Sequence, residues 1–294
     1  MSEEAHGMKA TKGGSSFGEF CRRFSRHRMA MLGFTVLMLE VLAVLVLPLL
    51  MELNPNGMDP TAFKAAPSAR HWLGTDEIGR DVFSRVVYGT RMSLFIGITS
   101  TAISAVLGIV LGLLAGYYRG VLEMAVMRAV DVFQSFPTMV LMLVLSAIFG
   151  SSVTNLILVI GILGWTTPAK LIHGKVLSVR SKEYIESARA IGTSDASILI
   201  RYVLPNAIAP VWMNLAFRVS HAIITESALS FLGAGVKPPQ ATLGNIIKSA
   251  ESMMILTDCP WMWLPAGLVL LLTVVCTNLT GEGVRDALDP KMKR

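Results

Sequence analysis

The chain of 294 residues is 53% hydrophobic and only 16% charged, with a mean hydropathy of +0.58. These values are too apolar for an ordinary soluble domain of this size, and they predict an all-α protein that crosses a membrane several times. The net charge of +6 is explained by positive inner loops and anionic lipid, so nucleic acid is not required as a partner.

Residues 1–20 are polar and rich in Gly and Ser, and no apolar core of a cleaved signal peptide precedes Arg22. We therefore expect a disordered basic cytoplasmic tail at 1–27, with the first span acting as the insertion signal. Residues 14–18 match the pattern G-x-S-x-G. That pattern marks a nucleophile only between a strand and a helix, so no catalytic role is expected here.

Six stretches approach the roughly 20 apolar residues that a membrane-spanning helix needs. They are residues 29–51, 92–117, 128–149, 153–172, 206–232 and 261–280. The fourth is interrupted at residues 165–168, which include Pro168, and Lys170 follows. This pattern predicts a first transmembrane helix at 28–52, an extracytoplasmic segment at 53–91, a five-helix core at 92–283 and a cytoplasmic tail at 284–294.

The basic residues indicate the orientation. With the N-terminus inside, 18 of the 26 Lys and Arg residues fall in inner segments, seven fall outside, and Arg218 lies within a span. Because short cytoplasmic loops are positively charged, both termini and the loop at 173–205 are predicted to be cytoplasmic.

Three features precede the cytoplasmic loop. Glu40 lies alone in the first span, where it could contact another subunit or serve transport. Asp81 and Arg85 are four residues apart, a spacing at which charges pair on a helix. In the second span, glycines recur every four residues and predict a ridge for close helix packing: Gly108, Gly112, Gly116 and Gly120.

Within the loop, the residue order predicts a short helix over 182–191. Ser181 can cap it, Glu183 and Glu186 suit its first turns, and Gly192 can adopt the left-handed conformation that ends it. Tyr184, Ala188 and Ile191 would form one narrow stripe, with small residues around it that allow another protein to approach.

A second helix is predicted to begin at residues 193–195 and to continue to Val203, before Pro205. The loop is thus helix, turn, helix, then membrane. It is typical of a docking site for a partner that supplies energy. The alternative is a solvated connection that merely joins two spans.

The fifth span contains an unusual polar face. Arg218 and Glu226 lie at i and i+8, with Ala222 between them and with His221 and Thr225 on the adjoining ridge. Charges at membrane depth are costly, so this face is predicted to line or gate a translocation path. The alternative is a buried Arg218–Glu226 pair that fixes helix packing.

No metal site, disulfide framework or enzyme activity is predicted for this chain. Its 17 methionines are scattered, and Cys21, Cys259 and Cys276 are odd in number and lack ligand spacing. The sequence contains neither a G-x-x-x-x-G-K-[ST] phosphate loop nor an H-E-x-x-H zinc motif.

The order Glu186-Ser187-Ala188, Gly192, Leu204-Pro205 resembles the EAA loop of ABC importer permeases, with Ser187 in place of the first Ala and Tyr202 where Ile is usual. Residues 71–76, 79–81, 228–233 and 285–290 resemble the second permease of dipeptide, oligopeptide and nickel importers. The likeness runs from about residue 22 to residue 293.

This resemblance implies a type I importer permease core of five helices with a peripheral first helix, in a bacterial or archaeal cytoplasmic membrane. The chain would be half of an alternating-access path, partnered by a second permease, two subunits that bind ATP and Mg, and an extracytoplasmic substrate-binding protein. That binding protein or the partner permease could contact residues 66–91, which otherwise brace the fold locally. No cofactor is implied for the chain itself.

The resemblance also implies which residues couple to the ATPase, with Glu186 and Gly192 the principal ones. The full set is Tyr184, Glu186, Ser187, Ala188, Arg189, Gly192, Leu204 and Pro205. Peptides are the expected cargo, and nickel or a metal chelate is the alternative. Two other classes of function remain open for the chain. One is a proton-coupled secondary transporter that uses Glu226 and His221, and the other is a membrane scaffold that transports nothing.

Overall fold

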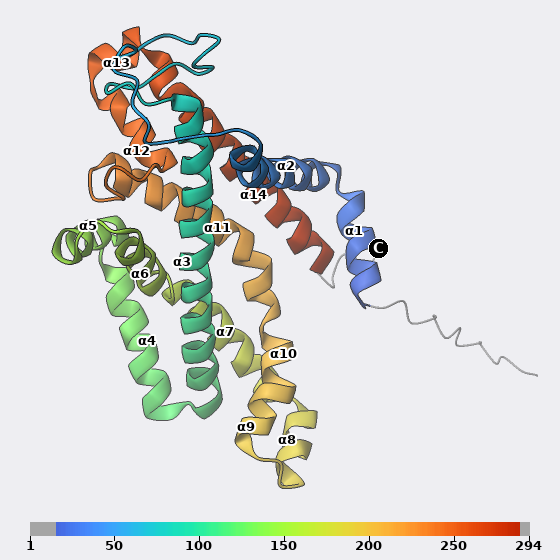
Figure 1. Ribbon diagram of the computed structural model, residues 1–294. Coiled ribbons are helices and arrows are strands. Elements are labelled where there is room, and N and C mark those ends of the chain that lie inside the picture. Colours follow the sequence, from blue (N-terminus) through green and yellow to red (C-terminus); the bar gives the residue numbers. More distant parts are fainter. Residues whose placement is uncertain (1–15, 289–294) are drawn as a thin grey trace, which may run out of the picture.

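The computed structural model describes residues 16–288, and this part of the chain is built from helices without a β-strand (Figure 1). The helices are α1 (Ser16–Arg26), α2 (Arg28–Leu50), α3 (Val82–Tyr118), α4 (Gly120–Ser135), α5 (Thr138–Phe149), α6 (Val153–Leu163), α7 (Thr166–Arg180), α8 (Glu183–Ala190), α9 (Asp195–Ile198), α10 (Leu204–Ala207), α11 (Ala209–Phe231), α12 (Leu243–Ile247), α13 (Met253–Asp258) and α14 (Leu264–Leu288). A π-helical stretch, Leu199–Val203, joins α9 to α10.

Within residues 16–288, four helices are long and apolar enough to cross a membrane: α2, α3, the combined α6 and α7, and α14. Two bent pairs, α4 with α5 and Asp195–Ala207 with α11, bring the number to six if each pair forms one span. The prediction of an all-helical protein with several spans is confirmed at this level.

The predicted third span, 128–149, is wrong as a single helix. The chain forms α4 and α5, which meet at an angle of 90°. Pro137 lies at the break, and Phe136 before it has an extended backbone (φ −95°, ψ 145°). A proline restricts the preceding residue to this region, so the helix ends there.

The other boundaries shift outward from their predicted positions. The second helix begins at Val82, so residues 82–91 of the predicted extracytoplasmic segment are part of α3. The fourth span continues to Arg180, because Pro168 lies in the first turn of α7, where its missing N–H is tolerated. The last helix extends to Leu288, so residues 284–288 are helical. The rest of the predicted tail, 289–294, lies outside the described residues.

The prediction of a disordered tail is wrong for residues 16–26, which form α1. Phe24 of this helix packs edge to face against Phe34 of α2, with ring centroids 5.8 Å apart. A Cβ atom at Gly283 of α14 would lie 2.9 Å from the Phe24 ring. Aromatic contacts therefore hold α1 against α2 and α14. Residues 1–15, including the start of the G-x-S-x-G match, lie outside the described residues.

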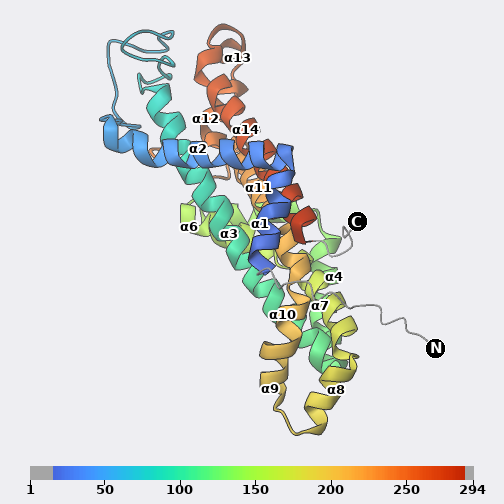
Figure 2. The same ribbon diagram turned by 90° about the vertical axis from the view of Figure 1, so that its right-hand side faces the viewer.

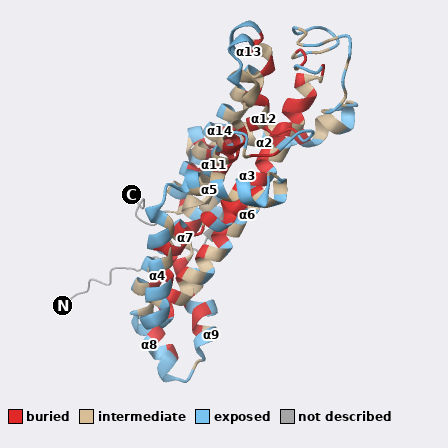
Figure 3. Ribbon diagram, turned by 90° about the vertical axis from the view of Figure 1, so that its left-hand side faces the viewer, coloured by how far each residue is buried: buried red, intermediate tan, exposed pale blue. Residues whose placement is uncertain are grey.

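The long helix α3 is the centre of the fold and packs against α6, α7 and α11. Buried residues gather where α3, α6 and α7 meet, whereas α8 is largely exposed (Figure 3). The predicted glycine ridge is confirmed for three positions. Cβ atoms at Gly108 and Gly112 would lie 2.6 and 2.5 Å from the carbonyl oxygens of Trp165, the N-cap residue of α7, and of Ala169, and one at Gly116 would lie 2.9 Å from Val176. Gly120 is not part of this contact and starts α4 with a φ of +58°.

Helix α2 lies across the outside of α3 and α14 (Figure 2), and it packs mainly on α14. Most of its residues are exposed or half-buried, as expected for a peripheral helix. Glu40 of α2 accepts a hydrogen bond from the Thr273 hydroxyl of α14. This carboxylate therefore has a partner within the chain.

Candidate coupling helix and translocation cavity

Helix α8 and the turn after it form the free end of the molecule (Figures 1 and 2). Its N-cap residue is Lys182, so the predicted cap at Ser181 is wrong by one position; the Ser181 hydroxyl donates to the Ser178 carbonyl instead, at 3.3 Å. Glu183 and Glu186 lie in the first turn, where the helix dipole favours negative charge. Gly192 has a φ of +81° and ends the helix in the left-handed conformation, as predicted.

The exposed face of α8 differs from the predicted stripe. Ile191 is 82% exposed and Tyr184 is 44% exposed, but Ala188 is buried together with Ile185. Since Ile185 supplies the larger apolar surface, it determines which face of this short helix turns inward. Ala188 thus anchors the helix. The other predicted coupling residues on α8 are exposed: Glu186, Ser187 and Arg189.

An apolar cluster attaches this end of the molecule to the membrane helices. Ile185 and Ala188 pack with Ile198 and Val203 of the following segment. From α7 the cluster includes Ile172, Val176 and Val179. Each of these side chains is almost completely removed from solvent. Helices α8 and α9 are therefore fixed to α7 as one packed unit.

A polar contact ties the same unit to the end of α3. The Tyr117 hydroxyl donates to Asp195 Oδ1 at 2.5 Å and accepts from Arg189 Nη2 at 3.3 Å. The Arg189 guanidinium carbon lies 5.8 Å from the centre of the Tyr117 ring, and the bond to Tyr117 raises the pKa of Arg189. Arg180 Nη1 donates to the Tyr117 carbonyl at 2.7 Å. Sequence reasoning missed Tyr117, because its partners lie more than 60 residues away.

The predicted second helix of the loop is only partly correct. It begins at Asp195 as expected, but after Ile198 the backbone widens into the π-helical stretch Leu199–Val203. Pro205 does not end the structure; Leu204 and Pro205 form the first turn of α10. Proline has no backbone N–H and cannot donate a hydrogen bond to the preceding turn, and a π-bulge accommodates this missing bond. A bend of 58° then leads into α11.

In α11 the structural pair of Arg218 with Glu226 is wrong. Eight residues along a helix separate their backbones by about 12 Å, and each side chain has its own partners. Arg218 Nη2 donates to Ser104 Oγ at 3.0 Å and to the Gly164 carbonyl at 2.6 Å. Glu226 accepts from Ser93 and Ser230, each at 2.8 Å.

The Glu226 carboxylate is the centre of a fully buried hydroxyl cluster. Ser227 also donates to it, at 3.4 Å, and the Ser93 hydroxyl accepts from the Leu243 backbone N–H at 3.2 Å. This cluster connects α11 with α3 and with the start of α12. Glu226 therefore lies in a packed junction between three elements.

Arg218 and His221 instead line a cavity of about 320 Å³ among α3, α4, α5, α6, α7 and α11. Thr225 lies one turn further along α11 and donates to the His221 carbonyl at 2.7 Å. The remaining lining residues are Ser100, Thr101, Ser104, Gln134, Thr138, Met142, Ile160, Leu163, Gly164, Thr166, Thr167 and Ala222. Sequence reasoning found the α11 residues but not the hydroxyl groups from the other helices.

At the opposite end of α3, the segment 51–81 also differs from expectation. Asp81 caps α3 by accepting from Ser84 N at 2.7 Å, and it lies 3.1 Å from His71 Nδ1. Arg85 pairs with Asp76 at 3.6 Å. The predicted Asp81–Arg85 pair is wrong, because a capping carboxylate turns toward the free N–H groups of the first turn.

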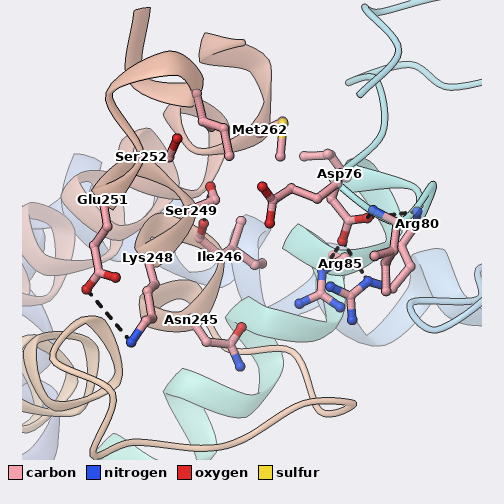
Figure 4. A pocket seen from close by; sticks show the side chains of 14 residues that line it. Asp76, Arg80, Arg85, Asn245, Ile246, Lys248, Ser249, Glu251, Ser252 and Met262 are labelled. Carbon is pink, nitrogen blue, oxygen red and sulfur yellow. Dashed lines mark hydrogen bonds and ion pairs between the residues drawn. The ribbon is translucent and has the colours of Figure 1, made fainter. Parts of the chain in front are cut away.

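A second cavity of about 350 Å³ lies between this segment and the α12 to α13 region (Figure 4). Asp76 and Arg80 form an ion pair of 2.6 Å on one side, and Lys248 and Glu251 form one of 3.8 Å on the other. Nearby, hydrogen bonds from Thr61 lower the pKa of Asp59 to about 2. This end of the molecule thus presents a densely charged surface.

Metal ligands do not gather in the described part of the chain. Residues 16–288 contain no group of three or more His, Cys, Asp or Glu side chains placed to hold a metal ion. Cys21, Cys259 and Cys276 are unpaired.

Residues 108–294 match the family described as "Binding-protein-dependent transport system inner membrane component". The chain belongs to this family. Residues 15–67 also match the family described as "N-terminal TM domain of oligopeptide transport permease C". The first match includes α8 and α11, so the predicted coupling residues and Arg218 lie in the region shared with the family.

Several curated relatives match over almost their full length. A putative peptide permease protein of Brucella suis biovar 1 is 36% identical over 99% of this chain and 99% of the relative. The glutathione transport system permease protein of Pectobacterium atrosepticum is 40% identical over 94% and 91%. The dipeptide transport system permease protein of Alkalihalophilus pseudofirmus is 34% identical over 95% and 91%.

Solved structures share the fold of this permease. Inward-facing conformations of the MetNI methionine ABC transporter match with a TM-score of 0.57, at 18% identity, over 70% of this chain and 97% of theirs. An amino acid ABC transporter crystallised with histidines matches with a TM-score of 0.51 over 69% and 94%, at 13% identity. These structures show the fold of ABC importer permeases, and the family match and the curated relatives show that the chain is a multi-pass membrane subunit of an importer.

Proposed function

We propose that this permease forms half of the translocation path of an ATP-driven peptide importer, and that α8 transmits the ATPase movement to it. The observation that carries this proposal is the arrangement of α8. Its outer face presents Tyr184 at the free end of the molecule, Ile191 directly after the helix is also exposed there, and its inner face is packed on α7. An exposed apolar patch on a rigid base is a typical protein interaction site.

The proposed partners are a second permease, two ATP-binding subunits that hold ATP and Mg, and an extracytoplasmic substrate-binding protein. The contacts with the ATP-binding subunit would use Tyr184, Glu186, Ser187, Arg189 and the turn at Gly192. Ala188 would support this face from behind, and Leu204 and Pro205 would connect it to α11. The charged cavity between Asp76 and Lys248 is our candidate surface for the binding protein.

Peptides are the proposed cargo, because the named relatives include peptide, dipeptide and glutathione permeases. The cavity beside Arg218 and His221, together with Thr225, is the proposed section of the path in this chain. A nickel importer is less favoured by these relatives. A proton-coupled carrier would require Glu226 and His221 to cooperate, whereas Glu226 bonds to a hydroxyl cluster and His221 lines the cavity.

Reconstitution tests the proposed function. Proteoliposomes with all five subunits should accumulate radiolabelled dialanine when ATP is present on the ATPase side, and omission of this permease or of the ATPase should abolish uptake. Uptake that continues without ATP, or without this chain, would reject the proposal.

We also propose that both termini and α8 lie in the cytoplasm of a bacterial cell, as the distribution of basic residues indicates. In a cysteine-free background, Phe63→Cys should react with an impermeant maleimide added to intact cells. Lys182→Cys should react only after the membrane is opened. Both positions are exposed in the structure, so labelling of position 182 in intact cells would reverse the orientation.

A further inference from the structure

The cavity beside Arg218 has an unbalanced charge. The guanidinium of Arg218 is held by two neutral oxygens, those of Ser104 and Gly164. Among the described residues, none that lines the cavity is a carboxylate. Arginine stays protonated in proteins, and an uncompensated charge at membrane depth is costly. An anion that enters the cavity would therefore be stabilised.

Two buried polar atoms in this cavity have no hydrogen-bond partner in the described part of the chain. They are Arg218 Nε and the Thr101 hydroxyl oxygen. Thr101 is only 3% exposed, and both residues belong to the cavity wall. Buried polar groups are normally satisfied, so an unsatisfied donor beside an open volume indicates room for a polar ligand.

The charged groups around the cavity favour an anion over a cation. Besides Arg218, the titratable lining residue is His221. At the edge, Lys170 Nζ donates to Gln134 Oε1 at 2.7 Å, and Lys170 is itself balanced by Asp131 at 3.5 Å. Arg218 thus remains the uncompensated charge. Hydroxyl and amide groups from Thr101, Thr138 and Gln134 can bond to any peptide group without selecting a side chain.

We propose that Arg218 receives the carboxylate of the peptide cargo as it passes through this cavity. The proposal rests on the proposed function and adds the chemical group that the path recognises. A volume of about 320 Å³ is at the small end of ligand pockets. It accommodates one terminal residue with its carboxylate and not a whole oligopeptide. A guanidinium can form two parallel hydrogen bonds to a carboxylate, and such charged bonds are the strong ones.

The test measures selectivity between two probes, dialanine and alanyl-alaninamide, which differ in the terminal carboxylate. Uptake of both is measured in proteoliposomes with the complete importer. The affinity of the binding protein for each probe is measured separately and does not change with the permease variant. A change in the acid-to-amide uptake ratio between permease variants therefore comes from the permease.

The ratio should fall about tenfold or more in Arg218→Gln, because a hydrogen bond to a charged group contributes roughly 1.5–3 kcal/mol. Arg218→Lys should retain most of the selectivity, because it keeps the charge. Arg128→Gln removes an exposed arginine on α4 and should leave the ratio unchanged. This matched control distinguishes an effect of the cavity on selectivity from an effect of removing any positive charge.

Two outcomes would overturn the proposal. Arg218→Gln could lower the uptake of both probes equally, which would assign the arginine to gating or to a bound phosphate or chloride. It could instead lose the partner permease during purification, which would mean that a partner carboxylate neutralises Arg218. Failure of the wild-type importer to take up either probe would reject the proposed peptide function and is distinct from both results.

Discussion

Charged residues occur both in α8 and in α11, but their surroundings are opposite: those of α8 face solvent, and those of α11 face other helices. In α8, Glu183 and Glu186 face outward, and an apolar face containing Ile185 anchors the helix. In α11, Arg218 and Glu226 face other helices and are met by neutral hydroxyl and carbonyl groups. The outward charges are free to meet a partner, whereas the inward ones are part of the fold or of a cavity.

This difference has an energetic consequence. Changing one of these exposed carboxylates on α8 removes interactions with water and costs the fold little. Changing a buried group on α11 leaves its hydrogen-bond partners unsatisfied. Substitutions in α8 should therefore affect assembly with a partner, and substitutions in α11 should affect the stability of the fold, when the two are measured independently.

The largest expected effect on stability is at the buried hydroxyl cluster. Glu226→Ala should lower the free energy of unfolding by roughly 2–4 kcal/mol, because it leaves buried hydroxyl groups without their acceptor and opens a void. Glu226→Gln keeps one acceptor oxygen and most of the volume, so it should cost less than half as much. Thermal unfolding of the purified permease measures both. An alanine variant that melts at the wild-type temperature would contradict the role of this cluster.

The next effect concerns the contact of α3 with α7. Helix α3 packs against α11, and α7 carries α8, so this contact supports both helices. A Cβ atom at Gly112 would lie 2.5 Å from the Ala169 carbonyl oxygen, so Gly112→Ala must displace backbone. We expect a loss of about 1–3 kcal/mol, as for other overpacked interiors. Gly174→Ala is the matched control, because its Cβ would meet nothing within 4 Å. Equal melting temperatures for the two variants would show that the helices can separate without cost.

A smaller and local effect is expected at the contact between α3 and α9. Tyr117→Phe removes the hydroxyl that bonds to Asp195 and Arg189, and it should lower the free energy of local opening of α9 by about 1 kcal/mol. Hydrogen exchange of the α9 amides measures this change. Tyr118→Phe alters the exposed neighbour and should have no effect. Unchanged exchange in Tyr117→Phe would mean that the apolar cluster alone holds this end.

The sequence predicted features that depend on local spacing. The all-helical fold with several spans, the left-handed turn at Gly192 and the glycine contacts at 108, 112 and 116 follow from helical periodicity and from the backbone preferences of glycine. The prediction failed where one position fits two arrangements. Ala188 is small enough for either face of α8, and the bulkier Ile185 decides between them. Pro137 breaks a span, whereas Pro168 is tolerated because it occupies a first turn.

The cavity could not be predicted from sequence, because its lining comes from six helices. In the sequence, Ser100 and Ser104 cannot be told from other small residues of a packed span. Their position beside Arg218 depends on how α11 packs against α3. The π-helical stretch before Pro205 could not be predicted either, because a helical backbone can accommodate a proline in several ways. Such features depend on tertiary packing and not on local pattern.

The most direct test of the account compares two exposed apolar residues at the same end of the molecule. Ile191 follows α8 and is 82% exposed, and Val121 in the first turn of α4 is 81% exposed. Each is replaced by aspartate, and the amount of ATP-binding subunit that co-purifies with the permease is measured. If α8 is the coupling helix, Ile191→Asp should lose most of the ATP-binding subunit while Val121→Asp retains it, with both variants melting like the wild type. Full retention of the ATP-binding subunit by Ile191→Asp would contradict the assignment of α8 as the coupling helix.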